Sequence, residues 1–172
     1  MEMRFFGNVY KSEPVRDGMN TTDLKRKVHI IVERATALKN KYISDKSASV
    51  NYACIFSQSK EEYNDLVEAA QKMGEVIKKT PTGLLFQIRP LQTVSGVLKL
   101  LKIRLPDKTR PEQGDADFTI SYFSDFKKRF LSRSGFTLIK RKEFEMIELM
   151  DSAFDVRAYF SNPPLDKQLG IK

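Results

Sequence analysis

The chain has 172 residues, of which 41% are hydrophobic, and its formal net charge at pH 7 is +8. That length suits one domain, or two small halves that share a core. No run approaches the roughly 20 apolar residues that cross a bilayer, and the start, MEMRFFGNVY, lacks the features of a secretory signal. The single cysteine, Cys54, excludes an internal disulfide, and we expect a cytoplasmic protein.

Residues 1–48 are predicted to form an arm followed by one long helix. The first 20 residues have no clear period, and a short strand or arm is indicated only by the apolar positions Phe5, Phe6, Val9 and Tyr10. Thr21-Thr22-Asp23 is typical of a helix start, and apolar residues then recur every three or four positions as far as Tyr42. This spacing predicts an amphipathic helix of about five turns.

The next segment, residues 49–106, predicts strand, helix and three strands. The first strand is the alternating run VNYACIFS at 50–57. Ser59 and Glu62 match a capping box, which starts a helix that Gly74 ends. Strands are then predicted at 75–79, 84–89 and 96–105.

Residues 112–172 repeat the same order. A strand at 115–121 precedes a helix capped by Ser121 or Ser124, and three strands follow at 136–140, 144–149 and 155–160 before Pro163-Pro164 ends the pattern. The seam between the two copies is the stretch from Lys99 to Ile120. Two βαβββ units of this kind predict an α+β fold with one curved, mixed or antiparallel sheet around a cleft, and helices outside.

This doubled unit resembles the vicinal oxygen chelate superfamily, whose members have the glyoxalase-like fold. The stretch SVNYACIFSQSKEEYNDLVEAAQKMGEVI is similar to the YecM-like branch, in which a strand of the type DHICLRV precedes a helix with an LG ending. LLKIRLPDKTRPEQGDADFTI and DVRAYFSNPPLDKQLGI resemble the later segments of that branch. The resemblance covers residues 49–171 and implies a divalent metal in the cleft, held by His and carboxylate side chains.

The metal positions of the family fall on poor ligands in this sequence. By the resemblance, the first-strand His falls at Asn51, the fourth-strand Glu at Arg104, the fifth-strand His at Asp115 and the following carboxylate at Asp117. The last position falls near Ser161 or Asn162. A guanidinium repels a dication, so only Asp115 and Asp117 remain as weak metal candidates, and we expect no bound cofactor.

Our first interpretation is a domain that binds a small, anionic ligand in its cleft, where Arg104 pairs a carboxylate or phosphate. The expected lining residues are Asn51, Gln87, Arg104, Asp115, Asp117, Glu145 and Tyr159. No motif identifies a catalytic residue, since Walker, dinucleotide, CxxC and HExxH patterns are absent. Whether the protein has a lyase or isomerase activity stays open.

Two other interpretations remain. The segment from Lys127 to Lys142 has seven basic residues and no acidic one, which allows a binding module that contacts nucleic acid or an acidic partner. The phenylalanines within it, at helical and strand spacing, are expected in the core. The third interpretation is a structural protein that forms a homodimer through its sheet edges or its first helix.

Overall fold

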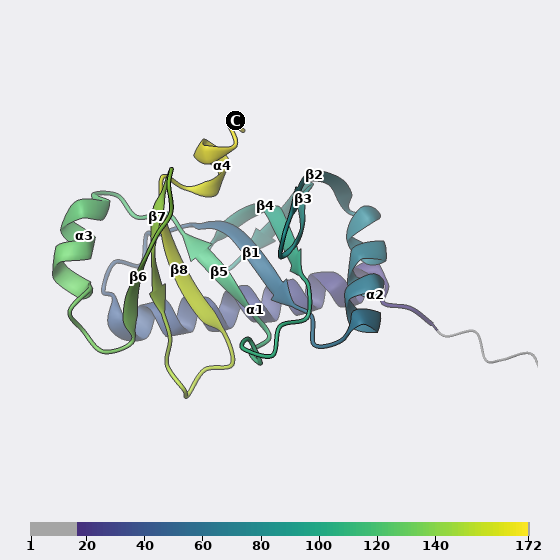
Figure 1. Ribbon diagram of the computed structural model, residues 1–172, viewed down its shortest axis with the longest axis horizontal. Helices are drawn as coiled ribbons and strands as arrows, with labels where there is room; N and C mark the ends of the chain where they lie inside the picture. Colours follow the sequence, from purple (N-terminus) through teal and green to yellow (C-terminus); the bar gives the residue numbers. More distant parts are fainter. Residues whose placement is uncertain (1–16, 172) are drawn as a thin grey trace, which may run out of the picture.

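The computed structural model describes residues 17–171 (Figure 1). The predicted arm at Phe5–Tyr10 therefore lies outside the described residues. The helices and strands are, in chain order, α1 (Thr21–Tyr42), β1 (Val50–Phe56), α2 (Lys60–Gln71), β2 (Gly74–Thr80), β3 (Gly83–Thr93), β4 (Gly96–Arg104), β5 (Gly114–Phe118), α3 (Phe123–Phe130), β6 (Phe136–Lys140), β7 (Glu145–Leu149), β8 (Arg157–Asn162) and α4 (Leu165–Gln168).

The eight strands form one sheet in the order β2-β3-β4-β1-β5-β8-β7-β6. The central pair, β1 and β5, is antiparallel, with Ala53 opposite Ala116. Each of these strands pairs in parallel with the last strand of its own half, β1 with β4 and β5 with β8. The sheet is mixed and not closed, and the chain is built from two βαβββ-like units after an N-terminal helix, which confirms the predicted fold class.

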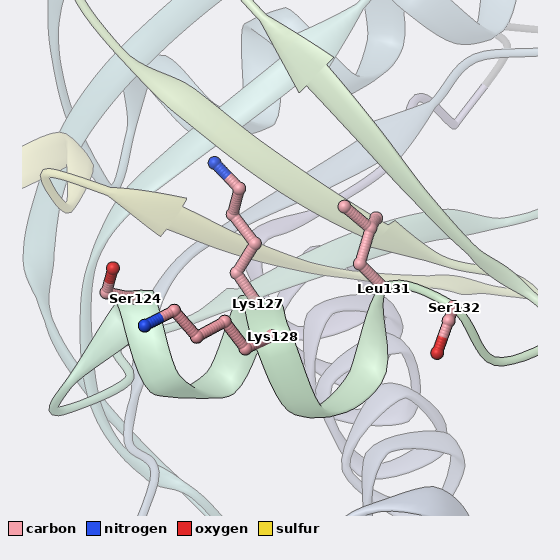
Figure 2. Close-up of a pocket in the computed structure, with 5 residues that line it drawn as sticks. All are labelled: Ser124, Lys127, Lys128, Leu131 and Ser132. Atoms are coloured by element: carbon pink, nitrogen blue, oxygen red, sulfur yellow. The ribbon is translucent and has the colours of Figure 1, made fainter.

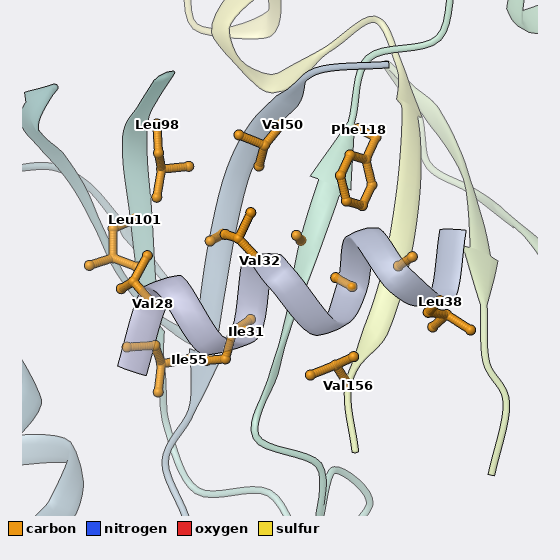
Figure 3. Packing of buried hydrophobic residues seen from close by; sticks show 14 of the residues in the cluster. Val28, Ile31, Val32, Leu38, Val50, Ile55, Leu98, Leu101, Phe118 and Val156 are labelled. Atoms are coloured by element: carbon orange, nitrogen blue, oxygen red, sulfur yellow. The ribbon is translucent and has the colours of Figure 1, made fainter. Parts of the chain in front are cut away.

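Helix α1 packs across the middle of the sheet, over both halves (Figures 1 and 3). Its predicted apolar stripe is buried from Leu24 to Leu38, and Tyr42 at its end is half-buried. Figure 3 shows Val28, Ile31 and Leu38 of the helix packed near the strand residues Ile55, Leu101 and Phe118 and near Val156, which precedes β8. Neither half therefore has a core of its own, because one helix covers the apolar face of both.

Helices α2 and α3 lie at opposite ends of the sheet (Figure 1). The predicted capping box of α2 is present, since Ser59 Oγ accepts from the Glu62 amide at 3.1 Å and Glu62 Oε2 accepts from the Gln58 amide at 2.7 Å. Helix α3 packs its phenyl rings onto the core, where Phe126 lies 4.8 Å from Phe160 between ring centroids.

Helix α1 begins at Thr21, as predicted, and Asn20 caps it, since its Oδ1 accepts from the Asp23 amide. Three other predicted boundaries were wrong. Gly74 does not end α2, which finishes at Gln71, and is instead the first residue of β2. Helix α3 begins after Tyr122, which has a left-handed backbone and no side-chain cap bond, so neither Ser121 nor Ser124 caps it. Pro163-Pro164 does not end the ordered chain, because α4 follows.

Gly114 marks the tightest packing between α1 and the central strand pair. A Cβ there would lie 2.1 Å from the Cys54 carbonyl oxygen and 2.9 Å from Ile31 Cδ1. Both contacts are shorter than any side chain tolerates, and the nearer one is to backbone. Only glycine lets α1, β1 and β5 approach this closely.

We therefore predict that Gly114→Ala lowers the free energy of unfolding by about 1–3 kcal/mol, the usual range for overpacking a core. Gly18→Ala is the control, since its added Cβ meets only Asp65 Oδ1 at 3.9 Å. Urea unfolding followed by circular dichroism measures both. Equal midpoints for the two variants would contradict the close approach.

Candidate functional site

The face of the sheet opposite α1 carries a cluster of charged and hydroxyl side chains, which we call the polar face. Register places Cys54 level with Lys102 on one side and Asp115 on the other, and Asp115 level with Arg157. The next row holds Asp117, Tyr159 and Glu148. Because side chains alternate along a strand, these residues share one face while their neighbours pack on α1.

Asp115 is the most unusual residue of the polar face. Its residue surface is only 5% exposed, and within residues 17–171 its Oδ1 is buried without a hydrogen-bond partner. Burial, with help from the neighbouring Asp117 charge, raises the pKa of the Asp115 carboxyl to about 7, although Arg110, Lys102 and Arg104 oppose the shift. The carboxyl is thus poised between its neutral and charged forms near neutral pH.

Asp117 lies on the same face, but both of its carboxyl oxygens already accept hydrogen bonds from Ser161. It accepts a short hydrogen bond from Ser161 Oγ and another from the Ser161 amide at 3.4 Å. Burial raises the pKa of the Asp117 carboxyl to about 7 even though these bonds favour the charged form. Asp117 therefore serves to join β5 to β8, and Asp115 is left as the carboxyl with a free oxygen.

The linker between the halves, residues 105–113, brings opposite charges onto the polar face. Arg104 Nη2 pairs with Asp107 Oδ2 at 3.3 Å, and Arg157 Nη2 pairs with Glu112 Oε2 at 3.1 Å. Hydrogen bonds from Thr109, and the Arg104 guanidinium, lower the pKa of Asp107 to about 2. Arg110 lies with its guanidinium 5.3 Å from the centroid of the Phe56 ring.

A second set of bonds ties the linker to β7 and β8. Arg110 Nη1 donates to Tyr159 Oη at 3.1 Å, and Tyr159 donates a short bond to Glu148. Glu148 also accepts from Arg157 Nη1 at 3.2 Å. Burial raises the pKa of the Tyr159 hydroxyl, and the nearby Asp115 charge adds to the shift. Tyr159 therefore stays a neutral hydrogen-bond donor at neutral pH.

Unpartnered buried atoms gather around this network. Five buried side-chain atoms of the described residues lack a hydrogen-bond partner, and three of them belong to the polar face: Arg104 Nε, Asp115 Oδ1 and Arg157 Nε. The other two, Asn51 Nδ2 and Ser57 Oγ, lie at the two ends of β1. Native proteins satisfy nearly all such atoms, so a group of them indicates a place where another molecule completes the bonds.

A cavity of about 200 Å³ opens at the Asn51 end. Its walls include Asn51, Lys99, Leu100, Asp166 and Ile171, so β1, β4 and the C-terminal segment enclose it. Asn51 Oδ1 accepts from the Asp166 amide at 3.4 Å, which holds α4 beside the cavity while Asn51 Nδ2 stays free to donate.

The structure brings together five of the seven residues expected to line the cleft. Arg104, Asp115, Asp117 and Tyr159 lie on the polar face, and Asn51 lies at its end. Gln87 pairs in register with Leu100 on β4, farther from this cluster.

Glu145 does not join them, because it lies on the helix-covered side and pairs with Lys127 at 3.0 Å. Glu148 takes its place, and sequence reasoning also missed Lys102, Arg110 and Arg157. Arg104 and Asp115 do not lie on adjacent strands, since β1 lies between β4 and β5.

The basic segment 127–142 is mostly exposed, and the phenyl rings within it, Phe130 and Phe136, are buried as expected. Leu138 is half-buried. Figure 2 shows Lys127 and Leu131 beside a surface pocket on α3, where Lys127 reaches toward the strands and pairs with Glu145. Since the rings are covered, this face offers no platform on which bases could stack.

A solved structure, the structural-genomics protein EC4020, matches 81% of this chain and 84% of its own, with a TM-score of 0.58 and 13% identity. At this level of identity the match shows that the chain shares the fold of EC4020. An NAD-dependent benzaldehyde dehydrogenase from Legionella pneumophila matches at a TM-score of only 0.36, with 15% identity over 64% of this chain and 96% of the other. No protein family and no curated protein matches the chain.

The metal that the family resemblance implies does not fit the residues at the positions that the resemblance assigns to it. Arg104 presents a permanent cation, Asp117 is bonded to Ser161, and Asn51 Oδ1 is bonded to α4. No group of three His, Cys, Asp or Glu side chains in residues 17–171 could hold a metal ion. In the same range no helix is long and apolar enough to span a membrane.

The buried carboxyls of Asp115 and Asp117 predict an unusual pH dependence of stability. Their pKa of about 7 in the folded protein exceeds the value near 4 in the unfolded chain. As pH rises from about 4 to 7, the unfolded chain loses these protons first, so the free energy of unfolding falls across this window. Asp115→Asn should reduce that fall by on the order of 2–4 kcal/mol.

Chemical unfolding at pH 4.5 and 7.5 measures this difference. Asp17→Asn is the control, because Asp17 is exposed and should leave the pH dependence unchanged. A wild-type protein equally stable at both pH values, with no difference between the variants, would show that Asp115 ionises normally.

We further predict that zinc, nickel and manganese produce no thermal shift at concentrations well above a typical catalytic-site affinity. Arg104 occupies the place of one ligand, and the remaining donors are oxygen atoms that suit magnesium or calcium better than zinc. Metal analysis after dialysis provides the second readout. A stoichiometry of about one metal per chain that survives dialysis and is lost in Asp115→Ala would contradict this prediction.

Proposed function

We propose that the protein binds a small anionic ligand on the polar face, beside Asp115 and Arg104. The observation that carries this proposal is the group of unpartnered buried atoms, two of which are guanidinium Nε atoms. An anion that accepts from Arg104 Nε would satisfy a donor that the protein leaves unpaired. Arg104 Nη2 would keep its bond to Asp107.

Asp115 supports the same proposal through its protonation. A carboxyl with a pKa of about 7 is neutral in a substantial fraction of molecules at neutral pH, and as a neutral group it donates a hydrogen bond. It can then donate to an anionic oxygen that Lys102 and Arg104 also attract. Charged and neutral donors around one space suit a carboxylate or a phosphate.

The proposal concerns binding of the ligand and assigns no catalysed reaction to the protein. Asp115 could exchange a proton with a bound molecule, as a carboxyl of raised pKa does in general acid and base catalysis, which keeps a lyase or isomerase activity open. Binding alone already accounts for the unpartnered atoms. The alternative, a nucleic-acid contact through residues 127–142, is less favoured because the aromatic rings there are buried.

The test is differential scanning fluorimetry with a panel of probes: inorganic phosphate, phosphoenolpyruvate, malonate, citrate and oxalate. We expect at least one to raise the melting temperature in a saturable way. Arg104→Gln should weaken that binding at least tenfold, since hydrogen bonds to charged groups contribute about 1.5–3 kcal/mol.

Lys108→Gln is the matched control, because Lys108 is an exposed cation in the same linker and should leave the affinity unchanged. Equal affinities in the two variants would remove Arg104 from the site. If none of the probes raises the melting temperature of the wild-type protein at about 10 mM, roughly the limit of weak binding, the proposal as a whole is contradicted.

A further inference from the structure

A second group of cations lies where the two outer hairpins approach α4 (Figure 1). We call this place the hairpin cleft, and its volume is about 530 Å³. The β2–β3 hairpin contributes Lys78 and Lys79, and the β6–β7 hairpin contributes Arg141, Lys142 and Phe144. Gln168 at the end of α4 lines it as well.

The cations of the hairpin cleft lack acidic partners, unlike several cations elsewhere in the described residues. Lys27 pairs with Glu62, Lys41 with Asp151 and Lys127 with Glu145. Within residues 17–171, no ion pair involves the four cations of the cleft; Arg141 donates to the Lys140 carbonyl at 3.2 Å. All four are exposed, and Glu143 is the one acidic residue in the lining.

The two halves supply these charges from equivalent places. Strands β2 and β6 are the two outermost strands of the sheet, and each is the first strand after the helix of its half. Lys78 and Lys79 lie near the end of β2, and Arg141 and Lys142 follow the end of β6. Like charges from two distant parts of the chain thus line one cleft, where a bound anion would reduce their repulsion.

We propose that the hairpin cleft binds a small ligand that carries two or more phosphate groups. Four cations against one carboxylate match a ligand of several negative charges, and a guanidinium with three ammonium groups is a donor set that phosphate oxygens prefer. The volume lies within the range of small-molecule sites and below what an extended polymer needs. Phe144, Pro81 and Leu169 add apolar wall for the uncharged part of the ligand.

Isothermal titration with inorganic tripolyphosphate tests this site, and it does so separately from the polar face. Lys78→Ala/Lys79→Ala and Arg141→Ala/Lys142→Ala should each weaken binding at least fivefold, because each removes two of the four cations. Lys108→Gln, which removes an exposed cation outside the cleft, should leave tripolyphosphate binding unchanged. Since all four side chains are exposed, the variants should keep the wild-type circular dichroism spectrum.

The matched controls remove equal charge elsewhere. Lys25→Ala/Lys60→Ala takes two exposed cations from α1 and α2 and should change the affinity less than twofold. If this control weakens binding as much as the cleft variants do, the attraction is only the overall positive charge and the proposal fails. The proposal also fails if only one of the two double variants weakens tripolyphosphate binding. It fails again if a 20-nucleotide oligothymidylate binds more tightly than tripolyphosphate and both cleft variants weaken that binding.

Discussion

The close contact of α1 with the β1–β5 pair is the constraint on which the rest of the structure depends. Gly114 has no side chain, so Ile31 and the Cys54 carbonyl can approach its backbone directly. This contact fixes which strand residues face the helix: Ala116 and Phe118 turn toward α1, and Asp115 and Asp117 must turn away. A one-residue slip would bury both carboxylates under the helix, so packing on one face dictates the chemistry of the other.

The charges of the polar face then have to be balanced by the connection between the halves. The central strand β5 places two carboxyls there, and the flanking strands place Lys102, Arg104 and Arg157 there. The linker supplies Asp107 and Glu112 to two of these cations. Buried ion pairs add little net stability, because desolvation opposes the attraction, but an unpaired buried charge is far more costly. The linker therefore orders the face without satisfying Asp115.

Much of the fold was predictable from local pattern, and the composition of the site was not. Period-2 and period-3.6 runs identified all eight strands and the first three helices. The strand EMIEL was ambiguous, because Glu145 and Glu148 lie on opposite faces and either parity places a carboxylate toward a cleft. Because Ile147 is buried in the core and side chains alternate along a strand, Glu148 is the carboxylate that lies on the polar face. Contacts such as Arg157–Glu112 join residues 45 positions apart, and no local pattern encodes them.

By the family resemblance, Arg104 falls at a position where an acidic metal ligand is expected, and its charge affects what the polar face attracts. A carboxylate at that place, with imidazoles on the central strands, would create a field that draws a dication. A guanidinium and Lys102 reverse the sign of the field along β4 and favour an anion. Asp115 is compatible with the reversed field because burial keeps it partly neutral, so it can donate where a charged carboxylate would repel. The raised pKa of Asp115 and the cations on β4 are thus compatible with each other, and together they support the proposed anion site.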